Sequence, residues 1–141
     1  ETISALYEAS QAGVKIDLIV RGVCALRPGI KGLSENIRVR SIIGRLLEHH
    51  RVFYFYAGGE EKVYLSSADW MERNFFRRIE LAFPILDKKH KRRVITEGLQ
   101  IYLADNQQSW QMDANGSYHA RRASRSKPRC AQSELIELLK P

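Results

Sequence analysis

The sequence has 141 residues, of which 44% are hydrophobic and 28% charged, a balance that is ordinary for a folded globular protein and argues against disorder for most of the chain. Its apolar stretches are interrupted by Arg, Lys or Glu, so none approaches the roughly 20 residues of a membrane-spanning helix. The 23 Lys and Arg residues outnumber the 16 acidic ones, and the resulting net charge of +7 favours polyanionic partners, among them nucleotides, nucleic acids and anionic membrane surfaces.

The first residues predict a helix followed by a strand. Residues 2–12 have helical periodicity, and Gly13 after them is a natural helix stop. VKIDLIVRG, residues 14–22, predicts a strand that ends near Arg21. Strand ends are where α/β sheets usually present ligand-binding groups. The Gly- and Pro-containing stretch that follows predicts a long loop that passes close to a ligand.

Two strand patterns come next. IRVRSI, residues 37–42, alternates apolar and basic residues and predicts a strand with Arg38 and Arg40 on one face. The clearest feature is residues 51–68, where two β-rich runs flank a Gly-Gly dipeptide. This pattern predicts a β-hairpin.

The middle of the chain returns to helical patterns. After Asp69 a short helix or turn is expected, and residues 78–86 predict a further buried strand that ends near Pro84. Residues 87–106 have helical periodicity behind a capping Asp87, so they predict the longest helix of the chain.

The last third predicts a short strand pair around Asn115-Gly116, a basic, Ser-rich loop at 120–130, and a short terminal helix with Ser133 as a candidate cap. Strands and helices therefore alternate along the chain, which favours the α/β class. We expect residues 1–141 to form a single domain.

The two cysteines and four histidines do not predict a metal centre. Cys24 and Cys130 lie far apart without metal-ligand spacing, which fits a reducing cytosol better than a disulfide framework. His49 and His50 are adjacent, so an extended backbone points them to opposite faces and only one of them can face a given cleft. The other two histidines stand in or beside basic runs and are expected to be solvated; they are His90 and His119.

Arginines from several predicted strands and loops suggest phosphate binding, because a guanidinium group matches phosphate oxygens in bidentate geometry. The five candidates are Arg21, Arg38, Arg40, Arg45 and Arg51. The sequence has neither a Walker loop nor the HRD and DFG motifs of protein kinases, so nucleotide chemistry requires another architecture. The phospholipase D superfamily offers one, in which a histidine, a basic residue two positions later and a Ser-rich strand end converge on a phosphate.

Two long strings in the sequence closely resemble one family. LIVRGVCALRPGIKGLSENIRVRSIIGRLLEHHRVFYF and GGEEKVYLSSADWMERNFFRRIELAFPI are similar to the last domain of bacterial polyphosphate kinase, and the resemblance continues through essentially the whole chain. It implies a phospholipase D-like mixed sheet flanked by helices. It also implies an enzyme that reversibly transfers the terminal phosphate of ATP to inorganic polyphosphate through a phosphohistidine. In that family the phosphorylated histidine belongs to the preceding phospholipase D-like domain, which this sequence lacks.

The resemblance assigns roles to individual residues. His49, in LEHHR, matches the active-site histidine of the second phospholipase D-like domain, where a general acid/base or a group that stabilises the transferring phosphoryl is expected. Arg21, in LIVRG, matches an arginine that contacts nucleotide phosphates. Magnesium is expected with ATP, its ligands lying outside this chain.

One position departs from the usual phospholipase D motif. Arg51 stands where that motif has a lysine, which weakens a phosphodiesterase interpretation. An arginine still suits phosphoryl transfer, which needs positioning and neutralisation of spreading negative charge. Ser66, Ser67 and Asp69 are candidates for orienting this site, although structural capping explains them nearly as well.

Two other function classes stay open at this point: a non-catalytic module that binds polyanions or nucleic acid, and half of a phospholipase D-type phosphodiesterase. On the preferred interpretation, the partners are ATP or ADP, inorganic polyphosphate and the remaining domains of the same enzyme. The full-length protein is expected to be a cytoplasmic homo-oligomer without a transmembrane segment, with peripheral attachment to the inner membrane left open. Nucleic acid is not an expected partner.

Overall fold

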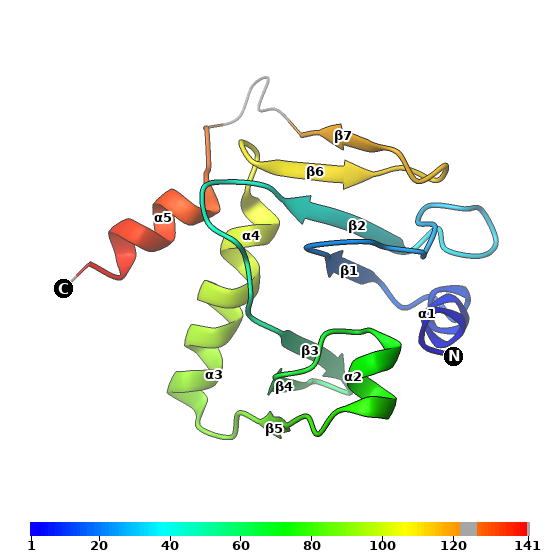
Figure 1. Ribbon diagram of the computed structural model, residues 1–141, viewed down its shortest axis with the longest axis horizontal. Helices are drawn as coiled ribbons and strands as arrows, with labels where there is room; N and C mark the ends of the chain where they lie inside the picture. The colour runs from blue at the N-terminus through cyan, green and yellow to red at the C-terminus, as the bar shows by residue number, and fades with distance from the viewer. Residues whose placement is uncertain (122–126, 141) are drawn as a thin grey trace. The chain divides into compact units, whose positions relative to one another are not determined.

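The computed structural model describes residues 1–121 and 127–140 (Figure 1). Within these ranges the chain is a mixture of helices and strands, so the α/β class predicted from the sequence is confirmed. Of the basic loop expected at 120–130, residues 122–126 lie outside the described part of the chain.

The described residues group into two compact units. Unit 1 contains Glu1–Leu47 and Ala104–Pro141, and unit 2 contains Glu48–Leu103. Each unit has its own β-sheet.

Unit 1 is built on a four-stranded mixed sheet. β1 and β2 are parallel, and β2–β6 and β6–β7 are antiparallel, in the order β1-β2-β6-β7. The strands are β1 (Ile16–Ile19), β2 (Ile37–Ile42), β6 (Ser109–Met112) and β7 (Tyr118–Ala120). β2 agrees with the predicted bounds, and β6 and β7 form the expected pair around Asn115-Gly116.

One face of this sheet carries the hydrophobic core. Leu26, Ile37, Val39 and Met112 are buried together, and Leu6 from helix α1 (Thr2–Gln11) packs against them. Gly13, with φ of +88°, follows α1 as the sequence predicted. Strand β1 ends two residues before Arg21, so that arginine lies at the beginning of the long loop to β2.

Arg38 and Arg40 of β2 have different environments although strand alternation puts them on the same face. Arg38 is exposed, whereas Arg40 is buried, with Nη2 3.6 Å from Oδ1 of Asp17 on β1. Desolvation is the main reason that the pKa of Arg40 is lowered, and the carboxylate of Asp17 opposes this shift.

Unit 2 contains the predicted hairpin. β3 (Val52–Ala57) and β4 (Glu60–Ser66) are antiparallel, and β5 (Ala82–Pro84) pairs with β4 on its other side. Gly58 and Gly59 form the two-residue turn with φ of +60° and +87°. This backbone conformation suits the right-handed twist of the strands and strongly favours glycine.

The expectation that residues 78–86 form a buried strand is wrong in part. A strand does form at Ala82–Pro84, but all three of its residues are exposed, as are Leu81 and Leu86 beside it. β5 is the edge strand of its sheet, and within the described chain no element packs its apolar side chains away from solvent. An apolar run in the sequence can predict a strand, but it does not show whether another element packs over the side chains of that strand.

The long helix predicted at 87–106 is confirmed, with a local change of geometry. It comprises α3 (Lys88–Ile95), the π-helical turn η1 (Thr96–Gln100) and α4 (Ile101–Ala104). The side chain of Asp87 accepts a hydrogen bond from the backbone N–H of His90 at 2.8 Å, so the predicted cap is present. The short helix expected after Asp69 is α2 (Glu72–Arg77).

The cap predicted for the last helix is wrong. α5 (Ala131–Leu138) begins two residues before Ser133, whose hydroxyl contacts Cys130 Sγ at 3.3 Å. The N-terminus of α5 is capped by a residue that is remote in sequence, because Oδ2 of Asp105 accepts a hydrogen bond from the backbone N–H of Ala131 at 2.7 Å.

Asp105 is therefore expected to be important for the stability of unit 1. It is fully buried, and its Oδ1 accepts the backbone N–H groups of Gln107 and Gln108 at 2.9 and 2.7 Å. Replacing Asp105 by Ala leaves these donors and that of Ala131 without an acceptor, so the free energy of unfolding should fall by about 3 kcal/mol. Urea titration of the chain measures this change.

Asp113 provides the matched control for Asp105. Its Oδ1 accepts from the backbone N–H groups of Asn115 and Ser117 in a similar turn, but the side chain is 36% exposed, so water can replace it. Asp113→Ala should therefore cost much less stability than Asp105→Ala. Equal losses for the two variants would contradict the role given to Asp105.

Candidate functional site

The histidines of LEHHR point in opposite directions, as the sequence predicted. Nδ1 of His49 lies 3.1 Å from Nη1 of Arg51, whereas Nε2 of His50 lies 3.1 Å from the carbonyl oxygen of Gly98 in η1. All of these residues belong to unit 2, where the segment Glu48–Arg51 leads into β3. His49 and Arg51 are thus brought together, and His50 faces the long helix.

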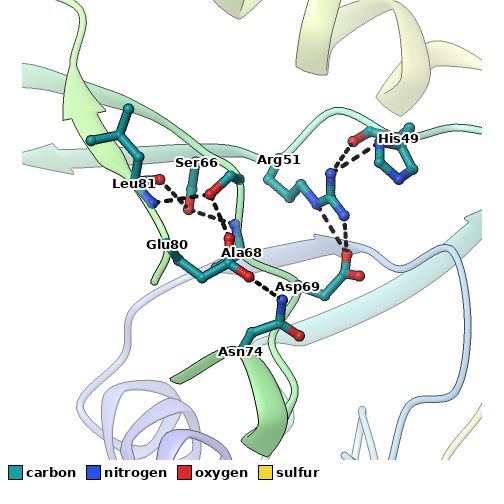
Figure 2. Close-up of polar contacts among 9 residues, drawn as sticks. His49, Arg51, Ser66, Ala68, Asp69, Asn74, Glu80 and Leu81 are labelled. Carbon is teal, nitrogen blue, oxygen red and sulfur yellow. Dashed lines mark hydrogen bonds and ion pairs between the residues drawn. The ribbon is translucent and has the colours of Figure 1, made fainter. Parts of the chain in front are cut away.

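Arg51 connects the histidine to an aspartate (Figure 2). Its Nε and Nη2 donate to Oδ1 of Asp69 at 3.0 and 2.8 Å, and its Nη1 also donates to the backbone carbonyl of His49 at 2.8 Å. The side chains of Arg51 and Asp69 are only 18% and 26% exposed. Partial burial strengthens these charge-assisted hydrogen bonds, so the guanidinium is held in a defined orientation.

The same contacts specify the tautomer of His49. A guanidinium nitrogen can only donate, so Nδ1 of His49 must accept the hydrogen bond from Arg51. The proton of the neutral imidazole is then on Nε2. Because His49 is exposed, this N–H is accessible as a hydrogen-bond donor to an anion.

The two serines near the end of β4 serve a different purpose. Both are bound to the residues before β5. Ser66 Oγ donates to the carbonyl of Leu81 at 3.1 Å (Figure 2), and Ser67 Oγ donates to Oε2 of Glu80 at 2.5 Å. Asn74 of α2 donates to the other oxygen of Glu80. The bonds from Ser67 and Asn74 lower the pKa of Glu80. This network fixes the loop that contains Asp69, and therefore the position of the partner of Arg51.

The predicted arginines are divided between the two units. Arg21 is exposed and belongs to unit 1, and only Arg51 belongs to unit 2. The other three of the five candidates also belong to unit 1; they are Arg38, Arg40 and Arg45. The roles that the resemblance assigns to Arg21 and His49 stay predictions.

The remaining candidates for chemistry are accounted for by local contacts. His90 is exposed beside Asp87, and Nε2 of His119 lies 2.8 Å from Oδ2 of Asp113. Both cysteines are free thiols. Among residues 1–121 and 127–140, no group of three or more His, Cys, Asp or Glu side chains could hold a metal ion.

Sequence reasoning missed the residues around His50. The hydroxyl of Tyr102 donates to Oε2 of Glu48 at 2.7 Å, and the Tyr102 ring lies 5.0 Å from that of His50. Burial, followed by the hydrogen bond to Glu48, raises the pKa of Tyr102, so the phenol stays protonated. Glu48 beside the histidine pair was a usable signal, but nothing in the sequence indicated its partner 54 residues later.

The fold and these motifs agree with a comparison against known families. The model of the family described as polyphosphate kinase C-terminal domain 2 matches residues 1–132. The chain belongs to this family. The resemblance and the phospholipase D-like fold expected from the sequence are thereby confirmed.

Individual relatives give the same result. The chain is 70% identical over 124 residues to a polyphosphate kinase of Burkholderia lata, a match that covers 88% of the chain and 18% of the relative. It is 66% identical over 134 residues to one of Paraburkholderia phytofirmans, covering 95% of the chain and 19% of the relative. The crystal structure of the polyphosphate kinase from Porphyromonas gingivalis superimposes with a TM-score of 0.92 at 44% identity, covering 98% of this chain and 21% of that one. The chain thus spans about a fifth of the length of these relatives.

No helix in residues 1–121 and 127–140 combines the length and the apolar character needed to cross a bilayer.

Proposed function

We propose that this chain acts within a longer polyphosphate kinase as its second phospholipase D-like domain. In that enzyme the terminal phosphate of ATP is transferred reversibly to inorganic polyphosphate through a phosphohistidine on the preceding domain. The observation that supports this best is the guanidinium of Arg51, which joins His49 to Asp69. This arrangement matches the histidine and following cation of the phospholipase D motif, with arginine in place of lysine.

His49 is proposed to act as a general acid/base or to stabilise the transferring phosphoryl group. Its Nε2–H is directed away from Arg51, because Nδ1 is the nitrogen that accepts from Nη1. A donor at this position neutralises charge that develops on phosphate oxygens or on the leaving oxygen during transfer. Arg51 holds the imidazole in that tautomer and adds a positive charge beside it.

Arg21 is proposed to contact the phosphates of the nucleotide. Its replacement by Ala should raise the KM for ATP about 10- to 100-fold, because a charge-assisted hydrogen bond is lost, with little change in thermal stability. Steady-state kinetics of the full-length enzyme, with ATP and polyphosphate varied separately, measures this change. Lys31→Ala is the control, since Lys31 is an exposed cation in the same loop. Equal KM values for Arg21→Ala and the unmodified enzyme would remove Arg21 from the nucleotide site.

Magnesium is implied with ATP, but the acidic side chains near His49 do not fit a magnesium site. Oδ1 of Asp69 accepts from Arg51, and the two oxygens of Glu80 accept from Ser67 and Asn74. The ion is therefore proposed to be held by the nucleotide phosphates and by parts of the enzyme outside this chain.

The other partners follow from the same proposal. ATP, ADP and polyphosphate are substrates or products, the remaining domains of the enzyme supply the phosphorylated histidine, and the full-length protein is a homo-oligomer. A cytoplasmic location fits an enzyme that uses ATP, and the two free cysteines fit a reducing compartment. Nucleic acid is not proposed as a partner.

The decisive experiment compares this chain with the full-length protein that contains it. Full-length protein supplied with ATP, magnesium and a polyphosphate primer should extend the primer, whereas the isolated chain should not. A full-length protein that binds polyphosphate, ATP and single-stranded DNA alike on filters without extending the primer would instead support a polyanion-binding module, which the +7 charge also permits. Phosphodiester hydrolysis without chain extension would support the phosphodiesterase class.

A further inference from the structure

The segment Glu48–Arg51 is anchored on both sides by alternate residues. His49 and Arg51 form one set of contacts, which ends at Asp69. Glu48 and His50 form the other set, directed at the long helix. Because successive residues of an extended segment point to opposite faces, each anchor constrains the side chains of the other.

The anchor on the helix side centres on His50. A carbonyl oxygen can only accept, so Nε2 of His50 donates its proton to the carbonyl of Gly98. Nδ1 of His50 faces Oε2 of Glu48 at 3.7 Å, and the same oxygen accepts from Tyr102. The side chain of Glu48 is 17% exposed and Tyr102 is buried. The hydrogen bond between these two residues is therefore largely shielded from water.

The helix is adapted to this contact at Gly98. Gly98 lies in the π-helical turn η1, where the backbone N–H of Ile101 bonds to the carbonyl of Thr96, five residues earlier. A Cβ at position 98 would lie 3.2 Å from Cγ2 of Val52 in β3, which is closer than ordinary packing. The absence of a side chain therefore allows the helix to approach the segment closely enough for the His50 hydrogen bond. Isolated π turns inside α-helices are frequent at functional sites.

We propose that His50 is a positioning residue for His49. Its hydrogen bond to Gly98, supported by Glu48 and Tyr102, fixes the backbone at 48–50 so that Nδ1 of His49 stays within reach of Arg51 and Nε2 stays in the productive orientation. This inference rests on the function proposed for His49. On this inference His50, the second histidine of the pair, acts by positioning His49 and does not itself contact the substrate.

Amide side chains separate the hydrogen bond of His50 to Gly98 from its contact with Glu48. The Nε2 of glutamine takes the place of the imidazole Nε2 and can donate to Gly98, whereas the Nδ2 of asparagine takes the place of Nδ1 and cannot reach that carbonyl. In the full-length enzyme, His50→Asn and His50→Phe should lower kcat about 10- to 100-fold, because small displacements of a reacting group are costly, and leave the KM for ATP within about twofold. His50→Gln should restore kcat to within about threefold of the unmodified enzyme.

A second readout tests the positioning itself. In full-length protein with 15N-labelled histidine, His49 should be predominantly the Nε2–H tautomer in the unmodified enzyme and in His50→Gln. The two tautomers should mix in His50→Asn and His50→Phe, because the contact with Arg51 loosens. A purely structural role would lower thermal stability in proportion to the loss of activity and leave the tautomer of His49 unchanged.

The outcomes separate the two proposals. If the unmodified full-length protein does not extend polyphosphate, the proposed function fails, and the tautomer of His49 still tests the positioning. If His50→Asn and His50→Gln have the same kcat and the same His49 tautomer, the positioning role is overturned while the proposed function stands.

Discussion

Replacing His49 by Ala in the full-length enzyme is expected to reduce polyphosphate synthesis by about 10²- to 10⁴-fold, the range typical for loss of a general acid or base. The alanine removes the imidazole that accepts from Nη1 of Arg51, and with it the Nε2–H donor. The loss should appear in kcat, measured as ATP-dependent extension of a polyphosphate primer at saturating ATP.

The fold should tolerate this change. His49 is exposed, and its backbone carbonyl can still accept the hydrogen bond from Nη1 of Arg51. The thermal midpoint of His49→Ala should therefore lie close to that of the unmodified enzyme. His90→Ala is the matched control, because His90 is an exposed histidine of the same unit whose Nδ1 lies 3.2 Å from Oδ1 of Asp87. Near-normal turnover of His49→Ala would remove His49 from the mechanism.

The elements that the sequence predicted well are those with local causes. The hairpin depends on two glycines with positive φ between β-rich runs. The start of the long helix depends on Asp87, whose side chain accepts a hydrogen bond from the backbone N–H of His90, three residues later. The errors arise where distant contacts decide. Asp105 caps α5 from 26 residues away, so the local pattern pointed to Ser133 instead. Similarly, the apolar pattern of β5 could not reveal that this edge strand is exposed.

The residues of the candidate site also fall into those that local sequence could predict and those that depend on distant contacts. His49 and Arg51 are two residues apart, so extended backbone alone places them on one side, and the family resemblance assigned the histidine its role. The partner of Arg51 required the register of the hairpin, which brings Asp69 back to the beginning of β3. The contacts of His50 could not be predicted in this way. They are made by Glu48, Tyr102 and Gly98, and they depend on the π-helical turn η1, which lies against β3. No sequence periodicity marks a single wide turn.

The second large effect is expected at Arg51. Its guanidinium donates to Asp69 from Nε and Nη2 and to Nδ1 of His49 from Nη1. Removal of this side chain therefore breaks the hydrogen bonds to both residues. Arg51→Ala should lower kcat about 10²-fold or more, because the tautomer of His49 and the charge beside it are both lost. It should also lower the free energy of unfolding by about 2 kcal/mol, since the partly buried carboxylate of Asp69 loses a charged donor.

Arg51→Lys tests whether geometry or charge is responsible. A lysine keeps the positive charge and restores the residue type of the usual phospholipase D motif, but a single ammonium cannot reproduce the planar, bidentate contact. Stability should recover more than kcat, because an ion pair with Asp69 can form while the contact with Nδ1 of His49 is lost. The double variant Arg51→Ala, Asp69→Ala should be no less stable than Arg51→Ala alone, because the carboxylate that lost its charged donor is also gone. Full activity of Arg51→Lys would show that a positive charge alone is sufficient, and that the hydrogen bonds from the guanidinium do not orient His49.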